Sequence, residues 1–212
     1  MPFRAVLFDF DGTLADSFGA IAASTNHVRE SYGMLPLPEA AVRRAVGYGI
    51  HHLLRELVPG KPLAEAVARY REHHPTVLVS GTRLLPGVAE TVVKLHERGY
   101  RLGVCSNKQV QYTNQLVEAF GLSAAVPLVL GPEDVDGRAK PDPAMLQEAM
   151  KRLGVKADET AYVGDMAIDV RTGRAAGLTT WLVTGGAEGE EPAAAAGPDR
   201  ILGEFSELLT LL

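Results

Sequence analysis

From about residue 84 onward, short apolar runs typical of β-strands alternate with amphipathic segments typical of helices. Gly99, Gly121 and Gly154 each follow a helical segment and are helix stop signals. Such alternation predicts a parallel sheet with helices on both faces. We therefore expect an α/β fold with a Rossmann-like sheet, whose strands are predicted at residues 5–8, 102–105, 127–130, 161–163, 180–183 and 200–202.

Residues 16–81 interrupt this alternation, because they contain no convincing strand-like run. Their apolar residues recur at helical spacing: positions 50, 53, 54 and 57 fit one helix face, and Pro59-Gly60 follows as a stop signal. We therefore expect a small helical cap domain over residues 16–81. The core domain is then discontinuous and comprises residues 1–15 and 82–212.

The overall composition excludes several classes of protein. The 212 residues carry a formal net charge of −5, and 46% of them are hydrophobic, which is enough for one sizeable core. A mildly acidic chain is not expected to bind nucleic acid, and its apolar runs are too short to cross a bilayer. One cysteine and no signal-peptide pattern are expected of a cytoplasmic protein. The oligomeric state stays open between monomer and homodimer.

Two carboxylates directly follow the first apolar run, in the stretch Asp9-Phe10-Asp11-Gly12. Carboxylates at the end of a buried strand usually have a metal, a cationic partner or a chemical role. Ligands of open α/β sheets bind at this end of the central strands. The alternative is a simple turn, for which Asp-Gly is a common signal.

Three further polar clusters follow predicted strands or the loops beyond them. The stretch Ser106-Asn107-Lys108 offers a hydroxyl and backbone N–H groups that suit a phosphate oxygen, or else it caps a helix. Lys140 stands before a proline, either in solvent or as a fixed cation near a phosphoryl group. Asp165 and Asp169 open a helix, where they either compensate its dipole or bind a hard cation such as Mg²⁺.

The four clusters together are more informative than any one of them. The carboxyl ends of parallel strands meet at one edge of a sheet, so all four can converge there. They would supply a nucleophile, an acid/base group, a hydroxyl, a cation and metal-binding carboxylates. That set is what phosphoryl transfer requires.

The order and spacing of these clusters resemble those of the haloacid-dehalogenase-like hydrolase superfamily, close to its phosphoglycolate-phosphatase group. Residues 9–14 resemble the first motif, Ser106 the second, Lys140 the third, and Gly164-Asp165 with Asp169 the fourth. The resemblance implies a helical cap inserted after the first motif. It also implies hydrolysis of a small phosphorylated metabolite.

The resemblance further implies a role for each motif residue. Asp9 would attack phosphorus and Asp11 would act as acid and base. Mg²⁺ would be held by Asp9, by the backbone carbonyl of Asp11 and by Asp165. The phosphoryl oxygens would be bound by Ser106, the N–H of Asn107 and Lys140, and Asp169 would orient Lys140 or a metal-bound water.

The leading substrate expected from the resemblance is 2-phosphoglycolate. A pyrophosphatase, a sugar-phosphate phosphatase and a β-phosphoglucomutase-like mutase are alternatives, although the basic cap motif of the mutase is not evident. A receiver-like phospho-accepting signalling domain also uses carboxylates, Mg²⁺, a hydroxyl and a lysine. Such domains are shorter, have no inserted cap and carry the phosphorylated aspartate on a later strand.

The predicted cap contains one candidate specificity segment, Gly47-Tyr48-Gly49, with Arg43 and Arg44 just before it. Arg43 or Arg44 would pair with a substrate carboxylate, and Tyr48 would shape the pocket. The alternative is a turn between helices with solvated arginines. The paired histidines 51–52 and 73–74 are expected to have structural or surface roles, because sequence neighbours do not share a helix face.

Overall fold

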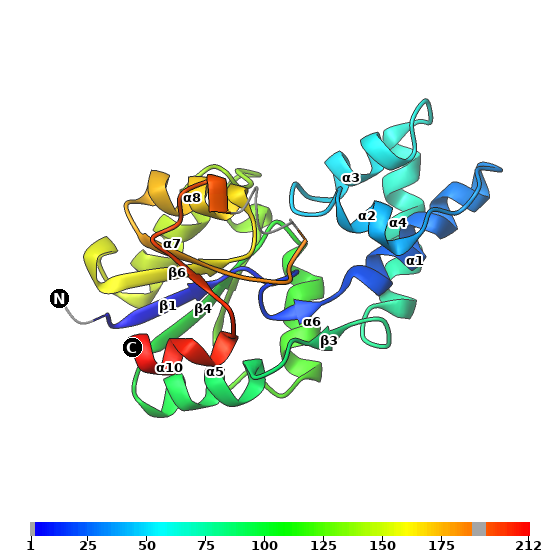
Figure 1. The fold of residues 1–212 in the computed structure, drawn as a ribbon. Coiled ribbons are helices and arrows are strands. Elements are labelled where there is room, and N and C mark those ends of the chain that lie inside the picture. Colours follow the sequence, from blue (N-terminus) through cyan, green and yellow to red (C-terminus); the bar gives the residue numbers. More distant parts are fainter. Residues whose placement is uncertain (1–2, 188–193) are drawn as a thin grey trace.

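The computed structural model describes residues 3–187 and 194–212, and its largest element is a six-stranded parallel sheet (Figure 1). The strand order is β5–β4–β1–β6–β7–β8. This confirms the predicted α/β class with a parallel sheet. The strands are β1 Ala5–Phe8, β4 Arg101–Cys105, β5 Leu128–Leu130, β6 Thr160–Gly164, β7 Thr179–Val183 and β8 Arg200–Leu202.

Strand β1 lies in the interior of the sheet, between β4 and β6. All four of its residues are buried, as expected for a parallel strand covered on both faces. Val6 and Phe8 pack into one apolar cluster, whereas Leu7 belongs to another. The two-residue period of a strand therefore places β1 side chains in the cores on both sides of the sheet.

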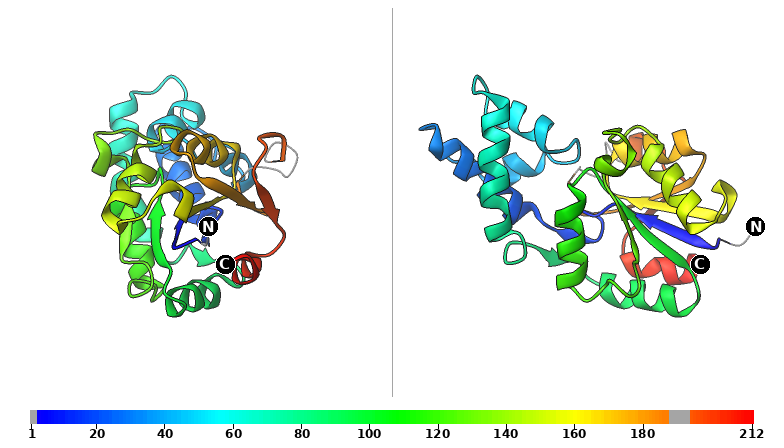
Figure 2. Two further views of the ribbon diagram at one scale, coloured as in Figure 1. Left: turned by 90° about the vertical axis from the view of Figure 1, so that its left-hand side faces the viewer. Right: turned by 180° about the vertical axis from the view of Figure 1, so that it is seen from behind.

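Helices cover both faces of the sheet, as the two further views show (Figure 2). Helices α5, α6 and α10 pack in the cluster that contains Val6 and Phe8, and α7 packs in the cluster that contains Leu7. Helix α8 contacts β6 and β7. The helices are α5 Val88–Glu97, α6 Val110–Ala119, α7 Ala144–Leu153, α8 Ala167–Ala176 and α10 Leu208–Leu211.

Helices α1 to α4 form a separate helical unit beside the sheet (Figure 1). Helices α1 and α4 pack along each other, and their apolar residues share a cluster with those of α2 and α3. Met166 and Ile168 from the sheet side also belong to this cluster, so the unit packs directly against the rest of the fold. The helices are α1 Phe18–Ser31, α2 Glu39–Arg43, α3 Ile50–Leu57 and α4 Leu63–Val77.

The chain enters and leaves the helical unit through two paired strands, which the sequence did not indicate. Strand β2, Ala15–Asp16, pairs antiparallel with β3, Arg83–Leu84. Both strands are only two residues long, which is too short for an alternating pattern to be recognised. The two segments that connect the sheet to the helical unit therefore lie side by side.

Within the described residues, no helix combines the length and the apolar character needed to cross a membrane.

Candidate active site

The carboxyl ends of three neighbouring strands bring the predicted site residues together. Asp9 follows β1, Ser106 follows β4 and Asp165 follows β6. Because these strands are parallel and adjacent, their ends meet at one edge of the sheet. Lys140 arrives from the loop before α7, and its Nζ lies 2.8 Å from Oδ2 of Asp9.

Lys140 is buried and lies between two carboxylates. Its Nζ lies 2.7 Å from Oδ1 of Asp169 and 2.8 Å from Oδ2 of Asp9. Burial opposes the charged ammonium, but the attraction of Asp169 and Asp9 outweighs it and raises the pKa of Lys140. The lysine is therefore a permanent cation beside Asp9.

Asp169 is fully engaged in holding this lysine and the turn around it. Its Oδ1 accepts hydrogen bonds from Lys140 and from the Tyr162 hydroxyl at 2.7 and 2.8 Å. Its Oδ2 accepts from the backbone N–H groups of Asp165 and Met166 at 3.2 and 3.1 Å. These bonds orient Lys140 and leave Asp169 less available as a ligand.

Asp9 has one paired and one unpaired oxygen. Oδ2 faces Lys140, whereas the buried Oδ1 has no hydrogen-bond partner among the described residues. Burial raises the pKa of Asp9 to about 6, although Lys140 opposes that shift. A buried unpartnered carboxylate oxygen is costly unless a cation or a reacting group binds there. The free oxygen of Asp9 is therefore available to a cation or to a reacting group.

Asp165 is held rigidly from two sides. Its Oδ1 accepts from the Thr13 hydroxyl at 3.0 Å, and its Oδ2 accepts from the backbone N–H of Ala187 at 2.7 Å. A Cβ added at Gly12 or Gly186 would lie 2.3 or 2.1 Å from Oδ2 of Asp165, so both glycines make room for it. Burial raises the pKa of Asp165 well above its usual value, and the nearby Asp169 and Asp9 add to the effect.

The three aspartates form a buried cluster that fits a metal ion. One carboxylate oxygen from each of Asp9, Asp165 and Asp169 lies within 4.8 Å of the others. A divalent cation here would neutralise Asp165, whose charge is otherwise disfavoured by burial. An all-oxygen donor set suits a hard cation.

Asp11 lies farther into the cavity and has its own cation. Its Oδ1 accepts from the Ser17 hydroxyl at 2.5 Å, and Nζ of Lys108 lies 3.1 and 3.3 Å from its two carboxylate oxygens. Sequence reasoning assigned no role to Lys108. The available signal was its position immediately after Ser106-Asn107, at the same strand end.

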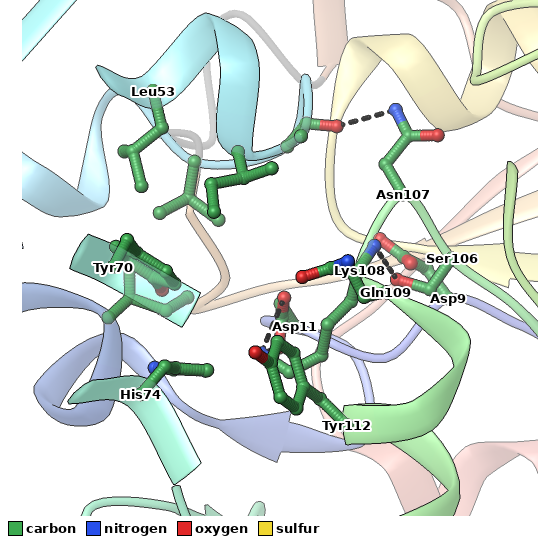
Figure 3. Close-up of a pocket in the computed structure, with 15 residues that line it drawn as sticks. Asp9, Asp11, Leu53, Tyr70, His74, Ser106, Asn107, Lys108, Gln109 and Tyr112 are labelled. Atoms are coloured by element: carbon green, nitrogen blue, oxygen red, sulfur yellow. Dashed lines mark hydrogen bonds and ion pairs between the residues drawn. The ribbon is translucent and has the colours of Figure 1, made fainter. Parts of the chain in front are cut away.

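A cavity opens above these residues, between the helical unit and the end of the sheet (Figure 3). Asp9, Asp11 and Ser106 lie on the sheet side of this cavity, and Tyr70 and His74 lie on the helical side. Most of its wall is apolar or aromatic. The other described residues that line it are Ile21, Val46, Gly47, Gly49, Ile50, Leu53, Asn107, Lys108, Gln109 and Tyr112.

Asn107 links the two sides of the cavity. Its side-chain Nδ2 donates to the carbonyl of Gly47 at 2.9 Å, and its Oδ1 accepts from the backbone N–H of Lys140 at 2.8 Å. The side chain therefore connects the helical unit to the loop that carries Lys140.

His74 belongs to the cavity wall, although its sequence suggested only a structural or surface role. It is 1% exposed, stacks on Tyr70 and contacts the ring of Tyr112 edge-on. Its Nδ1 lies 2.9 Å from the Ser24 hydroxyl. Burial and the nearby Lys108 lower the pKa of His74 to about 3, so the imidazole is neutral. Only the packing of α4 against α1 and α6 reveals this position.

The structure does not bring Arg43 or Tyr48 into this cavity. The Arg43 guanidinium lies 4.0 Å from the ring centroid of Phe18 and 3.6 and 3.5 Å from the carboxylates of Asp16 and Glu39. Tyr48 is 41% exposed, and its hydroxyl accepts a hydrogen bond from Arg171 at the outer surface. Neither side chain is among the described residues that line the cavity.

The raised pKa of Asp9 predicts how the stability of the metal-free protein depends on pH. The unfolded carboxyl titrates near 3.8 and the folded one near 6, so between these values the folded state binds more protons. The stabilising contribution of Asp9 to the free energy of unfolding is therefore present below pH 3.8 and is lost as pH rises through 6. We expect the advantage in unfolding free energy of Asp9→Asn over wild type to widen across this range, measured by urea unfolding with EDTA. A constant difference would contradict the assignment.

Comparison with known proteins agrees with a site built for phosphoryl transfer. The family model of haloacid dehalogenase-like hydrolases matches residues 6–183. The chain is 34% identical over 216 residues to a phosphoglycolate phosphatase from Rhodospirillum rubrum, covering 97% of this chain and 89% of that protein. It is 31% identical to pyrophosphatase PpaX from Halalkalibacterium halodurans, covering 100% and 98%.

Solved structures agree with these sequence matches. The crystal structure of a predicted phosphoglycolate phosphatase from Haemophilus somnus 129pt superposes with a TM-score of 0.91 at 25% identity, over 99% of this chain and 97% of that one. The fold and the sequence matches thus define a hydrolase of the haloacid dehalogenase-like class, with a buried aspartate cluster at the end of β1. The chain belongs to the haloacid dehalogenase-like hydrolase family.

Proposed function

We propose that this protein is a Mg²⁺-dependent phosphatase that hydrolyses a small phosphomonoester through an aspartyl-phosphate on Asp9. The observation that carries the proposal is the free Oδ1 of Asp9, a buried carboxylate oxygen beside the Lys140 ammonium and at the cavity wall. In the folded protein this oxygen is the unpartnered nucleophile of the cluster. A bound Mg²⁺ would neutralise the negative charge that the site presents to an anionic substrate.

The first half-reaction uses the two aspartates of the first motif. Oδ1 of Asp9 attacks phosphorus, and the bond from phosphorus to the ester oxygen breaks. Asp11, which faces the cavity, gives its proton to the departing alkoxide. Lys140 and the Ser106 hydroxyl hold the phosphoryl oxygens, and Asp169 keeps Lys140 in place.

The second half-reaction releases phosphate. Asp11 now takes a proton from a water molecule, whose oxygen attacks the phosphorus of the aspartyl-phosphate. The bond from phosphorus to Asp9 breaks, and inorganic phosphate leaves. Asp9 returns as a carboxylate and Asp11 as an acid, so the protein is unchanged after each turnover.

We propose 2-phosphoglycolate as the substrate, because relatives that align over nearly the whole chain are named phosphoglycolate phosphatases. The relative named pyrophosphatase PpaX supports pyrophosphate as the second candidate. We also assign residues 16–81 to a cap domain that closes the cavity against water, and the protein to the cytoplasm. The packing of the helical unit on Met166 and Ile168 supports this role for the cap.

A substrate panel tests the proposal. Phosphate release is measured for 2-phosphoglycolate, pyrophosphate and glucose 6-phosphate, each with Mg²⁺ and with EDTA. We expect the highest kcat/KM for 2-phosphoglycolate and a loss of at least about 10²-fold in EDTA, since the metal contributes several kcal/mol of charge stabilisation. Hydrolysis that is equally fast in EDTA would contradict the metal-dependent mechanism. A higher kcat/KM for another compound of the panel would contradict 2-phosphoglycolate as the substrate.

A further inference from the structure

One cation lies on the substrate side of the cavity. Among the described residues that line it, Lys108 is the one lysine or arginine, and its side chain is 5% exposed. The facing wall is apolar and is formed by Val46, Ile50 and Leu53 of the helical unit. His74 adds no second positive charge, because its lowered pKa keeps the ring neutral. A substrate group bound here therefore meets a single positive charge.

Lys108 is close to the position of the phosphoryl group. Its backbone N–H donates to the Ser106 hydroxyl at 3.3 Å, so the two residues share one turn after β4. Ser106 lies beside Asp9 at the sheet side of the cavity (Figure 3). A substrate whose anionic group is only a few bonds from phosphorus can therefore reach both residues.

Lys108 can change partners without leaving Asp11 unsatisfied. Its present partner is the Asp11 carboxylate, at 3.1 and 3.3 Å. Asp11 also accepts a hydrogen bond from the Ser17 hydroxyl, which stays in place when the lysine turns. By contrast, the predicted carboxylate partner Arg43 lies outside the cavity and is committed to Asp16, Glu39 and the Phe18 ring.

We propose that Lys108, and not Arg43, binds the carboxylate of the substrate's leaving group and so determines the specificity of the site. The inference rests on the proposed function. It names the residue that distinguishes 2-phosphoglycolate from phosphomonoesters whose leaving group carries no charge. A leaving group with one negative charge matches one ammonium in an apolar cavity, whereas the phosphate leaving group of pyrophosphate carries more charge than Lys108 neutralises.

The test compares two substrates that differ only at the group in question. Ethyl phosphate has a methyl group where 2-phosphoglycolate has a carboxylate. We expect wild type to prefer 2-phosphoglycolate by about 10²-fold in kcat/KM, which lies within the loss that follows truncation of one partner of a buried charge pair. Lys108→Met should abolish this preference, mainly through KM, and Lys108→Arg should restore part of it.

The ratio of kcat/KM for 2-phosphoglycolate to kcat/KM for ethyl phosphate separates a role in specificity from a role in positioning Asp11. Lys108→Met also removes the cation beside Asp11. This loss slows the hydrolysis of both esters equally, so it cancels in the ratio of their kcat/KM values. Arg43→Met is the matched control and should keep the wild-type preference. A preference that survives in Lys108→Met would overturn the inference while the phosphatase function stands, and so would a wild type that hydrolyses both esters equally. Absence of hydrolysis of either ester would instead overturn the proposed function.

Discussion

Replacing Asp9 by asparagine is expected to lower kcat by at least about 10⁴-fold, since the loss of a covalent nucleophile leaves only binding and electrostatic contributions. The amide of asparagine is nearly isosteric with the carboxylate but does not attack phosphorus. The measurement is steady-state phosphate release with Mg²⁺, using the best ester of the panel.

The fold should survive this substitution. Asp9 is a buried carboxylate whose pKa is already raised to about 6, so a neutral side chain of the same shape suits the position. We therefore expect the metal-free variant to unfold no earlier than wild type at neutral pH. Asp158→Asn, in the turn before β6, changes the same group far from the site and should keep kcat within about twofold. Residual activity of Asp9→Asn within tenfold of wild type would exclude Asp9 as the nucleophile.

Lys140→Met is expected to reduce both stability and activity. It leaves the carboxylates of Asp9 and Asp169 buried without their shared cation, and loss of one partner from a buried ion pair costs about 3–5 kcal/mol. The same lysine would hold the transferred phosphoryl group, so kcat should fall by about 10³-fold. Urea unfolding of the metal-free protein and phosphate release measure the two effects.

Lys151→Met is the matched control for this experiment. Lys151 also pairs with a carboxylate, Glu148, at 3.4 Å, but its side chain is 79% exposed. Exposed pairs of this kind contribute about 0–1 kcal/mol, so the control should stay close to wild type in both measurements. Equal losses in the two variants would show that burial of the Lys140 cluster is not the cause.

The sequence predicted the strands and the polar residues after them because both follow local rules. Apolar runs bounded by turns identified β1, β4 and β6 to within one residue at each end. The parallel arrangement then implied that Asp9, Ser106 and Asp165 converge. The strand order itself does not follow from any local pattern, because it depends on which apolar faces pack together.

The wall of the cavity depended on contacts that no local pattern encodes. The position of Arg43 before the loop 47–49 predicted contact with substrate, yet the ring of Phe18 and the carboxylate of Asp16 hold its guanidinium outside the cavity. His74 reaches the cavity only because the helical unit packs against α6 and the end of the sheet, as its contact with the ring of Tyr112 shows. Tertiary packing therefore decided which charged groups are near the substrate.

The stereochemical course at phosphorus tests the central claim most directly. The phosphorothioate analogue of 2-phosphoglycolate, made chiral at phosphorus by one sulfur and two oxygen isotopes, is hydrolysed in water of the third oxygen isotope. The configuration of the released thiophosphate is then determined. Attack by Asp9 followed by attack by water comprises two in-line displacements, so we expect net retention of configuration. Inversion would mean that water attacks the substrate directly, and it would contradict an aspartyl-phosphate on Asp9.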